Sequence, residues 1–387
     1  MSWKYLLSDV DLGNEEADAV ADVVRSKWLS MGPRTAQFEQ AFAEAMQVKH
    51  AVAVSNCTTA LHLALIANGV GPGDEVLVPS YTFVASANAC LYVGATPVFV
   101  DIVGPSDLNL CCDDLERKIS PRTKSIIAVH IAGFPANMDR LTEIAKKHNL
   151  KIIEDACHAI GAVYSGDCRS SLNGRKAGTI GDAGCFSFFA NKNLVTGEGG
   201  MLVTNDDGIA AQTRLLRSHG MTKSSWDKAS GRAMDYDVTC LGYNYRCTEI
   251  TAAIGRIQLR KLSESNERRL RLVEAYRKNL ASLEGVILPF ASRLEDSAHH
   301  IFPIVLAKEG YQADVRKKLA DQGIQTSLHY PPVHLFSHYR DLYPTVNLAR
   351  TESVAQREIT LPLHPLLTID DVKIISETVI EVVSEAV

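Results

Sequence analysis

Short apolar runs alternate with helical stretches along the first two thirds of the chain. Segments with helical spacing lie between most of these runs, at 58–68, 86–93 and 139–148. Strands that alternate with helices in this way form a mostly parallel sheet covered on both faces. The pattern therefore predicts an α/β fold around a mostly parallel, seven-stranded sheet. The seven runs that we interpret as buried strands are 52–54, 75–79, 97–100, 125–130, 151–154, 184–188 and 201–204.

The pattern changes near residue 250. A long amphipathic segment without proline runs from 247 to 283 and predicts one connecting helix. Beyond it we expect strands at 301–306, 324–328 and 359–361, a helix at 313–322 and a terminal helix from Ile369. The sequence thus predicts two domains, a large α/β domain at 1–250 and a small α+β domain at 251–387.

Composition excludes several classes of protein. Of the 387 residues, 46% are hydrophobic and 22% are charged, which is typical of a globular chain. A formal charge of -5 without a basic tract argues against a nucleic-acid partner, and no apolar run is long enough to cross a membrane. The nine cysteines form no C-x-x-C pair and have no metal-ligand spacing, so we expect reduced thiols and no metal in a cytoplasmic protein.

Polar side chains cluster where predicted strands end, the edge at which α/β sheets bind ligands. Asp155 follows the run 151–154, Ser187 lies near the end of 184–188, and Lys192 comes five residues later. Thr58 opens a helix after the first strand. Each has an ordinary structural interpretation: Asp155 as a helix cap, Lys192 as a solvated side chain, and His158 as a core histidine.

Together, these residues meet the demands of one cofactor, pyridoxal 5'-phosphate. A helix amino terminus at Cys57 and Thr58, with Ser187 beside it, suits a phosphate dianion. Asp155 suits a protonated ring nitrogen, which makes the ring an electron sink. Lys192 is the only lysine in this group and can form a Schiff base with the aldehyde.

Nine motifs in order along the chain resemble the DegT/DnrJ/EryC1/StrS family of pyridoxal-phosphate sugar aminotransferases. The resemblance covers nearly the whole chain and implies the fold type I architecture of those enzymes. The motifs are WLSMG (28–32), SNCTTAL (55–61), PSYTFVA (79–85), GATPVFVD (94–101), EDACHAIG (154–161), SFFANK (187–192), GEGG (197–200), GYNYR (242–246) and LPLHP (361–365).

The resemblance also implies roles for single residues. Lys192 would hold the cofactor as a Schiff base, Asp155 would bind the ring nitrogen, and Phe83 would stack on the ring. Thr58 and Ser187 would bind the phosphate. Asn244 would reach it from the neighbouring subunit, which implies a homodimer with composite sites.

Two positions depart from the family pattern. Cys57 stands where many members have glycine, so the approach to the phosphate must tolerate a small side chain. His158 stands where many members have glutamine, beside the expected ring hydroxyl. Members that act at the 4-position of a nucleotide-linked keto sugar often carry histidine there, which favours that position.

The resemblance implies an aminotransferase of polysaccharide or glycoside biosynthesis. It would move an amino group from L-glutamate, through pyridoxamine phosphate, to a keto sugar linked to a nucleoside diphosphate, and release 2-oxoglutarate. His329 and Tyr330 would contact the acceptor or serve the structure alone. A cyclitol or cyclic keto acid is an alternative acceptor. A sugar dehydratase and a non-catalytic sensor are less favoured, because such dehydratases carry histidine at the position of Lys192 and a sensor would not need all these residues.

Overall fold

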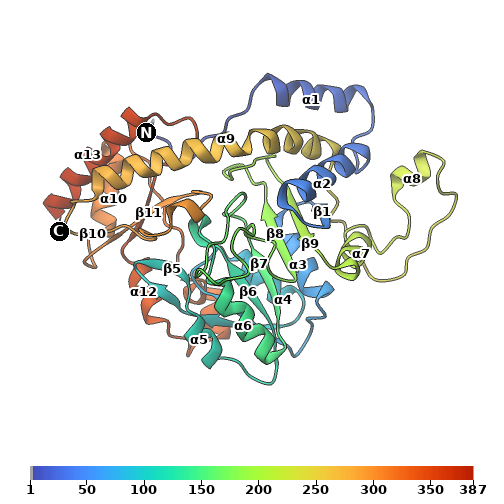
Figure 1. Cartoon of the computed structure of the whole chain (residues 1–387), viewed down its shortest axis with the longest axis horizontal. Coiled ribbons are helices and arrows are strands. Elements are labelled where there is room, and N and C mark those ends of the chain that lie inside the picture. Colours follow the sequence, from blue (N-terminus) through green and yellow to red (C-terminus); the bar gives the residue numbers. More distant parts are fainter. Residues whose placement is uncertain (1–2, 387) are drawn as a thin grey trace.

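The computed structural model describes residues 3–386 and is built around a seven-stranded sheet (Figure 1). The strand order is β1-β9-β8-β7-β6-β2-β3. Only β9 runs antiparallel to its neighbours, so the prediction of a mostly parallel sheet is confirmed. The strands are β1 (His50–Val54), β2 (Glu75–Pro79), β3 (Thr96–Val100), β6 (Thr123–Val129), β7 (Lys151–Asp155), β8 (Ala183–Ser187) and β9 (Gly200–Thr204).

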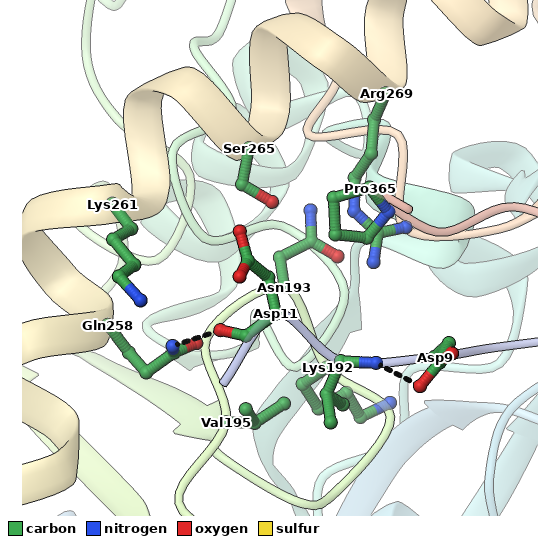
Figure 2. Close-up of a pocket in the computed structure, with 11 residues that line it drawn as sticks. Asp9, Asp11, Lys192, Asn193, Val195, Gln258, Lys261, Ser265, Arg269 and Pro365 are labelled. Atoms are coloured by element: carbon green, nitrogen blue, oxygen red, sulfur yellow. Dashed lines mark hydrogen bonds between the residues drawn. The ribbon is translucent and has the colours of Figure 1, made fainter. Parts of the chain in front are cut away.

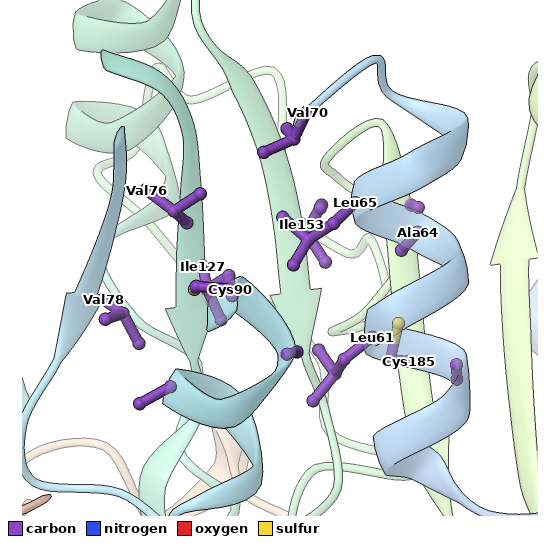
Figure 3. Close-up of a cluster of buried hydrophobic side chains, with 14 of the residues drawn as sticks. Leu61, Ala64, Leu65, Val70, Val76, Val78, Cys90, Ile127, Ile153 and Cys185 are labelled. Atoms are coloured by element: carbon purple, nitrogen blue, oxygen red, sulfur yellow. The ribbon is translucent and has the colours of Figure 1, made fainter. Parts of the chain in front are cut away.

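Helices cover both faces of this sheet because its central strands are apolar on both sides. Helices α3 (Cys57–Ala67), α4 (Ala85–Tyr92) and α7 (Asp207–Leu216) pack on one face. Figure 3 shows Leu65 of α3 beside Ile153 and Cys90 of α4 beside Ile127. Helices α2 (Pro33–Met46) and α6 (Met138–His148) pack on the opposite face.

Helix α9 (Glu249–Leu280) extends across both halves of the molecule (Figure 1). It begins at Thr248, whose side chain accepts a hydrogen bond from Thr251 N. Helices α1 (Asn14–Arg25) and α2 contact α9, as does α13 (Ile369–Ala386). The predicted connecting helix is therefore present. The division into two domains at residue 250 stays a prediction.

The C-terminal part contains a three-stranded antiparallel sheet, β10 (Val286–Ile287), β11 (Phe302–Leu306) and β12 (Glu358–Leu361), next to α10 (Gln312–Asp321). The predicted strand at 324–328 is wrong. Its backbone bonds first to Tyr5 and then to Thr360, so it forms single bridges to two partners and no continuous ladder.

The remaining elements are short. Among residues 3–386, no helix is both long and apolar enough to span a bilayer. The short elements are β4 (Ile102–Gly104), β5 (Asp107–Leu110), α5 (Cys112–Arg117), α8 (Ser225–Ala229), α11 (Ser337–Leu342), α12 (Ala349–Ala355) and three 3-10 turns, Ile131–Gly133, Leu294–Asp296 and Val333–Leu335.

Candidate active site

A cavity of about 450 Å³ lies at the carboxyl ends of β1, β2, β7 and β8. Asn244 does not line it. Asn244 is exposed and forms a backbone bridge with Ser218. His329 and Tyr330 also line the cavity. The structure brings seven of the eight predicted site residues together here: Cys57, Thr58, Phe83, Asp155, His158, Ser187 and Lys192.

One end of the cavity is the amino terminus of α3. Asn56 caps the helix, and its Oδ1 accepts a hydrogen bond from Thr59 N at 2.9 Å. The N–H groups of Cys57 and Thr58 lie in the first turn and have no carbonyl partner within the helix. They are therefore available to a ligand. Such a terminus attracts anions. Gly200 permits the close approach of β9, because a Cβ there would lie 2.4 Å from the Asn56 carbonyl carbon.

Ser187 ends β8 beside this helix terminus and lines the same cavity. Its Oγ accepts a hydrogen bond from Phe189 N at 3.3 Å, which leaves the hydroxyl proton available to an anion. Thr58 also contributes a hydroxyl. Two backbone donors and two hydroxyls thus surround one end of the cavity, which is the donor set that a phosphate monoester needs.

Asp155 is the last residue of β7 and is buried. Ser86 Oγ donates to its Oδ2 at 2.7 Å, and Cys157 N donates to its Oδ1 at 3.2 Å. Thr82 Oγ1 contacts Ser86 Oγ at 3.1 Å. These contacts fix the carboxylate toward the cavity, where it can bind a cationic N–H group.

Glu154, the residue before Asp155, holds the loop that precedes β8. Its buried carboxylate accepts hydrogen bonds from Gly178 N, Ile180 N and Gly181 N. Burial alone would raise the pKa of Glu154, but His130 and these backbone donors hold it below its ordinary value. The charged form of Glu154 therefore helps to position the ends of β7 and β8.

Lys192 extends into the cavity from the loop after β8, and its Nζ lies 3.3 Å from His300 Nε2. Burial lowers the pKa of Lys192, and the nearby Cys157 and Asp155 oppose part of that effect. A lowered pKa increases the fraction of free amine, which is the nucleophilic form.

The hydrogen bonds around His300 define its tautomer. Asn193 Nδ2 donates to Ala298 O at 2.6 Å and to Asn266 Oδ1 at 2.9 Å, so Asn193 Oδ1 is the atom that faces His300. His300 Nδ1 lies 3.1 Å from that oxygen and must carry the proton. His300 Nε2 is then an acceptor, and the Lys192 amine donates to it.

Helix α9 contacts both the loop that carries Lys192 and the segment that carries His300, on the side away from the cavity. Figure 2 shows the small pocket at this junction, where Gln258 of α9 donates to Asp11 O at 2.9 Å. Arg269 is buried and donates to the carbonyl oxygens of His299, His300 and Leu363. One helix thereby holds both partners of the Lys192–His300 contact.

The opposite wall of the cavity is aromatic. His158 Nε2 contacts Tyr330 OH at 2.8 Å, while His158 Nδ1 has no hydrogen-bond partner within residues 3–386. Burial holds the pKa of His158 well below its ordinary value, so the ring is neutral. Phe83 is 58% exposed, and its ring centroid lies 6.0 Å from that of Tyr330. An exposed phenylalanine at a cavity mouth is suited to cover a flat ligand.

These observations fit pyridoxal phosphate. The helix terminus and hydroxyls suit its phosphate, Asp155 suits its ring nitrogen, and the Lys192 amine suits its aldehyde.

Comparison with known proteins identifies the family. A model of the DegT/DnrJ/EryC1/StrS aminotransferase family matches residues 10–380. The chain belongs to this family. It is therefore an aminotransferase, as the sequence motifs predict.

Two curated relatives of this family member match along nearly their whole length. GDP-perosamine synthase of Caulobacter vibrioides is 41% identical over 93% of the chain and 93% of the relative. The spore coat polysaccharide biosynthesis protein SpsC of Bacillus subtilis is 38% identical over 97% of the chain and 96% of the relative.

Solved structures bear on the fold and the cofactor. Spr1654 of Streptococcus pneumoniae in its PMP form has a TM-score of 0.90 and 30% identity, covering 99% of this chain and 100% of that one. The same protein has also been solved in a PLP form. The predicted aminotransferase fold and pyridoxal phosphate as the cofactor of this family member are thereby confirmed.

Several residues of the site were not among those predicted. The Ser86 side chain contacts Asp155, the His300 side chain contacts Lys192, and Asn193 orients His300. Ser86 lies in the first turn of a helix after a predicted strand, which is a detectable signal. His300 comes before a predicted strand, but nothing in its own segment indicates that it faces Lys192.

Proposed function

We propose that this aminotransferase moves an amino group from L-glutamate to a keto sugar carried by a nucleoside diphosphate, at the 4-position of the sugar. The observation that carries the proposal is the Lys192 amine, free of carboxylate partners within residues 3–386 and facing Asp155 across one cavity. The sugar biosynthesis named for the Caulobacter and Bacillus relatives supports a sugar acceptor.

The bound cofactor would supply an electron sink for the carbon that loses or gains a proton. Asp155, oriented by Ser86, would keep the ring nitrogen protonated. The N–H groups of Cys57 and Thr58, with Ser187, would bind the phosphate. Phe83 would cover the ring on its solvent side.

Lys192 would take the proton from the α carbon of the donor substrate and return it to the carbon that was the aldehyde of the cofactor. Its contact with the neutral His300 ring would hold the amine in reach between these two steps. His158 would present its unpaired Nδ1 toward the ring edge. His329 and Tyr330, from the C-terminal part, would contact the acceptor.

The assignment of Lys192 is tested by covalent labelling. Borohydride reduction of the holoenzyme followed by peptide mapping is expected to find the cofactor on Lys192. The Lys192→Ala variant is expected to lose both the spectral change on adding glutamate and product formation. Lys151→Ala is the matched control, because Lys151 lies exposed at the opposite end of β7. Labelling of another lysine would overturn the assignment.

The acceptor is tested with glutamate and a panel of 3-keto and 4-keto nucleotide sugars. Mass spectrometry and NMR of the product are expected to find an amine at carbon 4. Amination at carbon 3, or of a cyclitol ketone alone, would refute the proposed acceptor. Loss of a hydroxyl without amine transfer would instead identify a dehydratase.

We also propose a homodimer in which Asn244 completes the partner's site. Asn244 belongs to the segment 218–246, which projects from the body around α8 (Figure 1). Mixing Lys192→Ala with Asn244→Ala chains is the decisive experiment. In a mixed dimer, one site would carry both substitutions and the other site would carry neither. Random mixing makes about half of the dimers mixed, and each of these has one intact site of two, so about a quarter of the wild-type activity should return. No recovery would contradict the composite site.

A further inference from the structure

Two cysteine thiols and a carboxylate meet in the wall of the cavity. The Sγ atoms of Cys57 and Cys157 and an oxygen of Asp155 all lie within 4.8 Å of one another. Cys57 opens α3, and Cys157 follows β7 by two residues, so strongly anchored elements hold all three groups.

The geometry points to a site for a soft divalent cation, Zn²⁺ or Cd²⁺, on Cys57, Cys157 and Asp155 of the cofactor-free chain. This inference rests in part on the proposed function, because Asp155 and the α3 terminus are also the proposed cofactor ligands. The cation and the cofactor would therefore exclude each other.

The chemistry of the ligands selects the cation. Thiolate sulfur prefers Zn²⁺ and related soft metals, whereas Mg²⁺ and Ca²⁺ prefer oxygen alone. Zn–S bonds of about 2.3 Å and Zn–O bonds of about 2.0 Å put tetrahedral ligand atoms about 3.3–3.8 Å apart. The three ligand atoms of the cluster already lie within 4.8 Å of one another, close to this range. The fourth position would face the cavity and accept water.

Charge balance also favours the complex. Two thiolates and one carboxylate carry three negative charges, and a divalent cation leaves one of them uncompensated. Lys192 lines the same cavity as both thiols, and its protonated form can neutralise that charge. A buried group of charges is tolerated when it is paired in this way. Binding would release the two thiol protons to solvent, because metal ligands must be deprotonated.

The site depends on a feature of this particular chain. The first thiol belongs to Cys57, which lines the cavity at the start of α3. Glycine would offer no ligand there. The thiol at position 57 thus completes a set of three metal ligands.

The test uses the full chain with and without its cofactor, in a non-thiol reductant. Cd²⁺ is added and its ultraviolet thiolate charge-transfer band is measured, with Zn²⁺ followed by competition against a chelating dye. The cofactor-free chain is expected to bind one Cd²⁺, and the holoenzyme none at the same concentration. Cys57→Ser and Cys157→Ser are each expected to weaken binding at least about tenfold, since even loss of an outer-shell contact costs that much.

Controls separate this site from other thiols and from misfolding. Cys168→Ser is the matched control, because Cys168 is exposed and outside the cavity, and it should bind Cd²⁺ like the wild type. Reconstitution of each cysteine variant with cofactor checks that the cavity is folded. Cd²⁺ added first should block that reconstitution in the wild type until EDTA is added.

The outcomes distinguish this inference from the proposed function. An unchanged Cd²⁺ band in both cysteine variants would overturn the metal site, even where borohydride labels Lys192. Equal Cd²⁺ binding by cofactor-free and holo forms would overturn mutual exclusion. Labelling of a lysine other than Lys192 would count against the proposed function and leave the thiol–metal band unaffected.

Discussion

Replacing Glu154 by glutamine should be among the most destabilising conservative changes in the sheet. The carboxylate is fully buried and receives four hydrogen bonds, from His130 at 2.8 Å, Gly178 N at 2.8 Å, and Ile180 N and Gly181 N at 2.6 Å each. His130 Nδ1 accepts from Ala136 N, so His130 Nε2 carries the proton and is a donor.

The expected magnitude follows from these contacts. Glutamine keeps one acceptor oxygen but turns an NH₂ group toward two donors, so two buried donors lose their partner. Each unsatisfied buried donor costs about 1–3 kcal/mol, and disruption of a buried ionic network costs about 3–5 kcal/mol. We therefore expect Glu154→Gln to lower the free energy of unfolding by about 3–5 kcal/mol at neutral pH.

The assay is urea denaturation of the cofactor-free protein, followed by circular dichroism. Glu143→Gln is the control, because Glu143 is exposed and its one ion pair among residues 3–386 is with Arg140 at 2.7 Å, a contact of about 0–1 kcal/mol. The native pKa of Glu154 is lowered, so its contribution is fully present above the ordinary glutamate pKa of 4.5 and is lost as pH falls through the native value. Equal losses in Glu154→Gln and Glu143→Gln would refute the reasoning.

Three further predictions concern the cavity. Ser86→Ala removes a charge-assisted hydrogen bond to Asp155, and spectroscopic titration should find cofactor binding about tenfold weaker or more; an unchanged affinity would count against this role. His300→Leu removes the acceptor of the Lys192 amine and should shift the pH profile of its reductive methylation down by about 0.5–1 unit, whereas a purely structural role would leave the profile unmoved. Phe83→Ala should change stability by less than about 0.5 kcal/mol but weaken cofactor binding about two- to tenfold; the reverse pattern in melting and binding assays would contradict a ring-covering role.

Much of the fold could be predicted because the central strands are buried on both faces. Runs such as 201–204 (Met-Leu-Val-Thr) are buried throughout and mostly apolar, and they match β9 (Gly200–Thr204) closely. The segment 324–328 (Ile-Gln-Thr-Ser-Leu) has polar residues at its centre and bridges two different partners, and no local signal indicates that change of partner. A strand can therefore be predicted from the sequence where its apolar residues are buried in one continuous sheet.

Some residues of the candidate site could likewise be predicted from the sequence, and others could not. Asp155, Ser187 and Thr58 were found because the ends of parallel strands must meet at one edge of the sheet. His300 was missed because its place beside Lys192 depends on Asn193 and on the distant helix α9. Contacts between side chains of remote segments follow from packing, which a single sequence does not encode locally.

The residues that line the cavity are far apart in the sequence, from Asn56 to Tyr330. This sequence separation affects how the protein should be produced. Such long-range contacts form slowly during folding. A chain that has not yet assembled its sheet therefore cannot bind pyridoxal phosphate. A compound that binds only the finished fold stabilises it by about 2.7 kcal/mol at a hundred times its dissociation constant. Pyridoxine in the culture medium should therefore raise the yield of intact enzyme, and the yellow colour of a cell extract should report how much of the chain has matured.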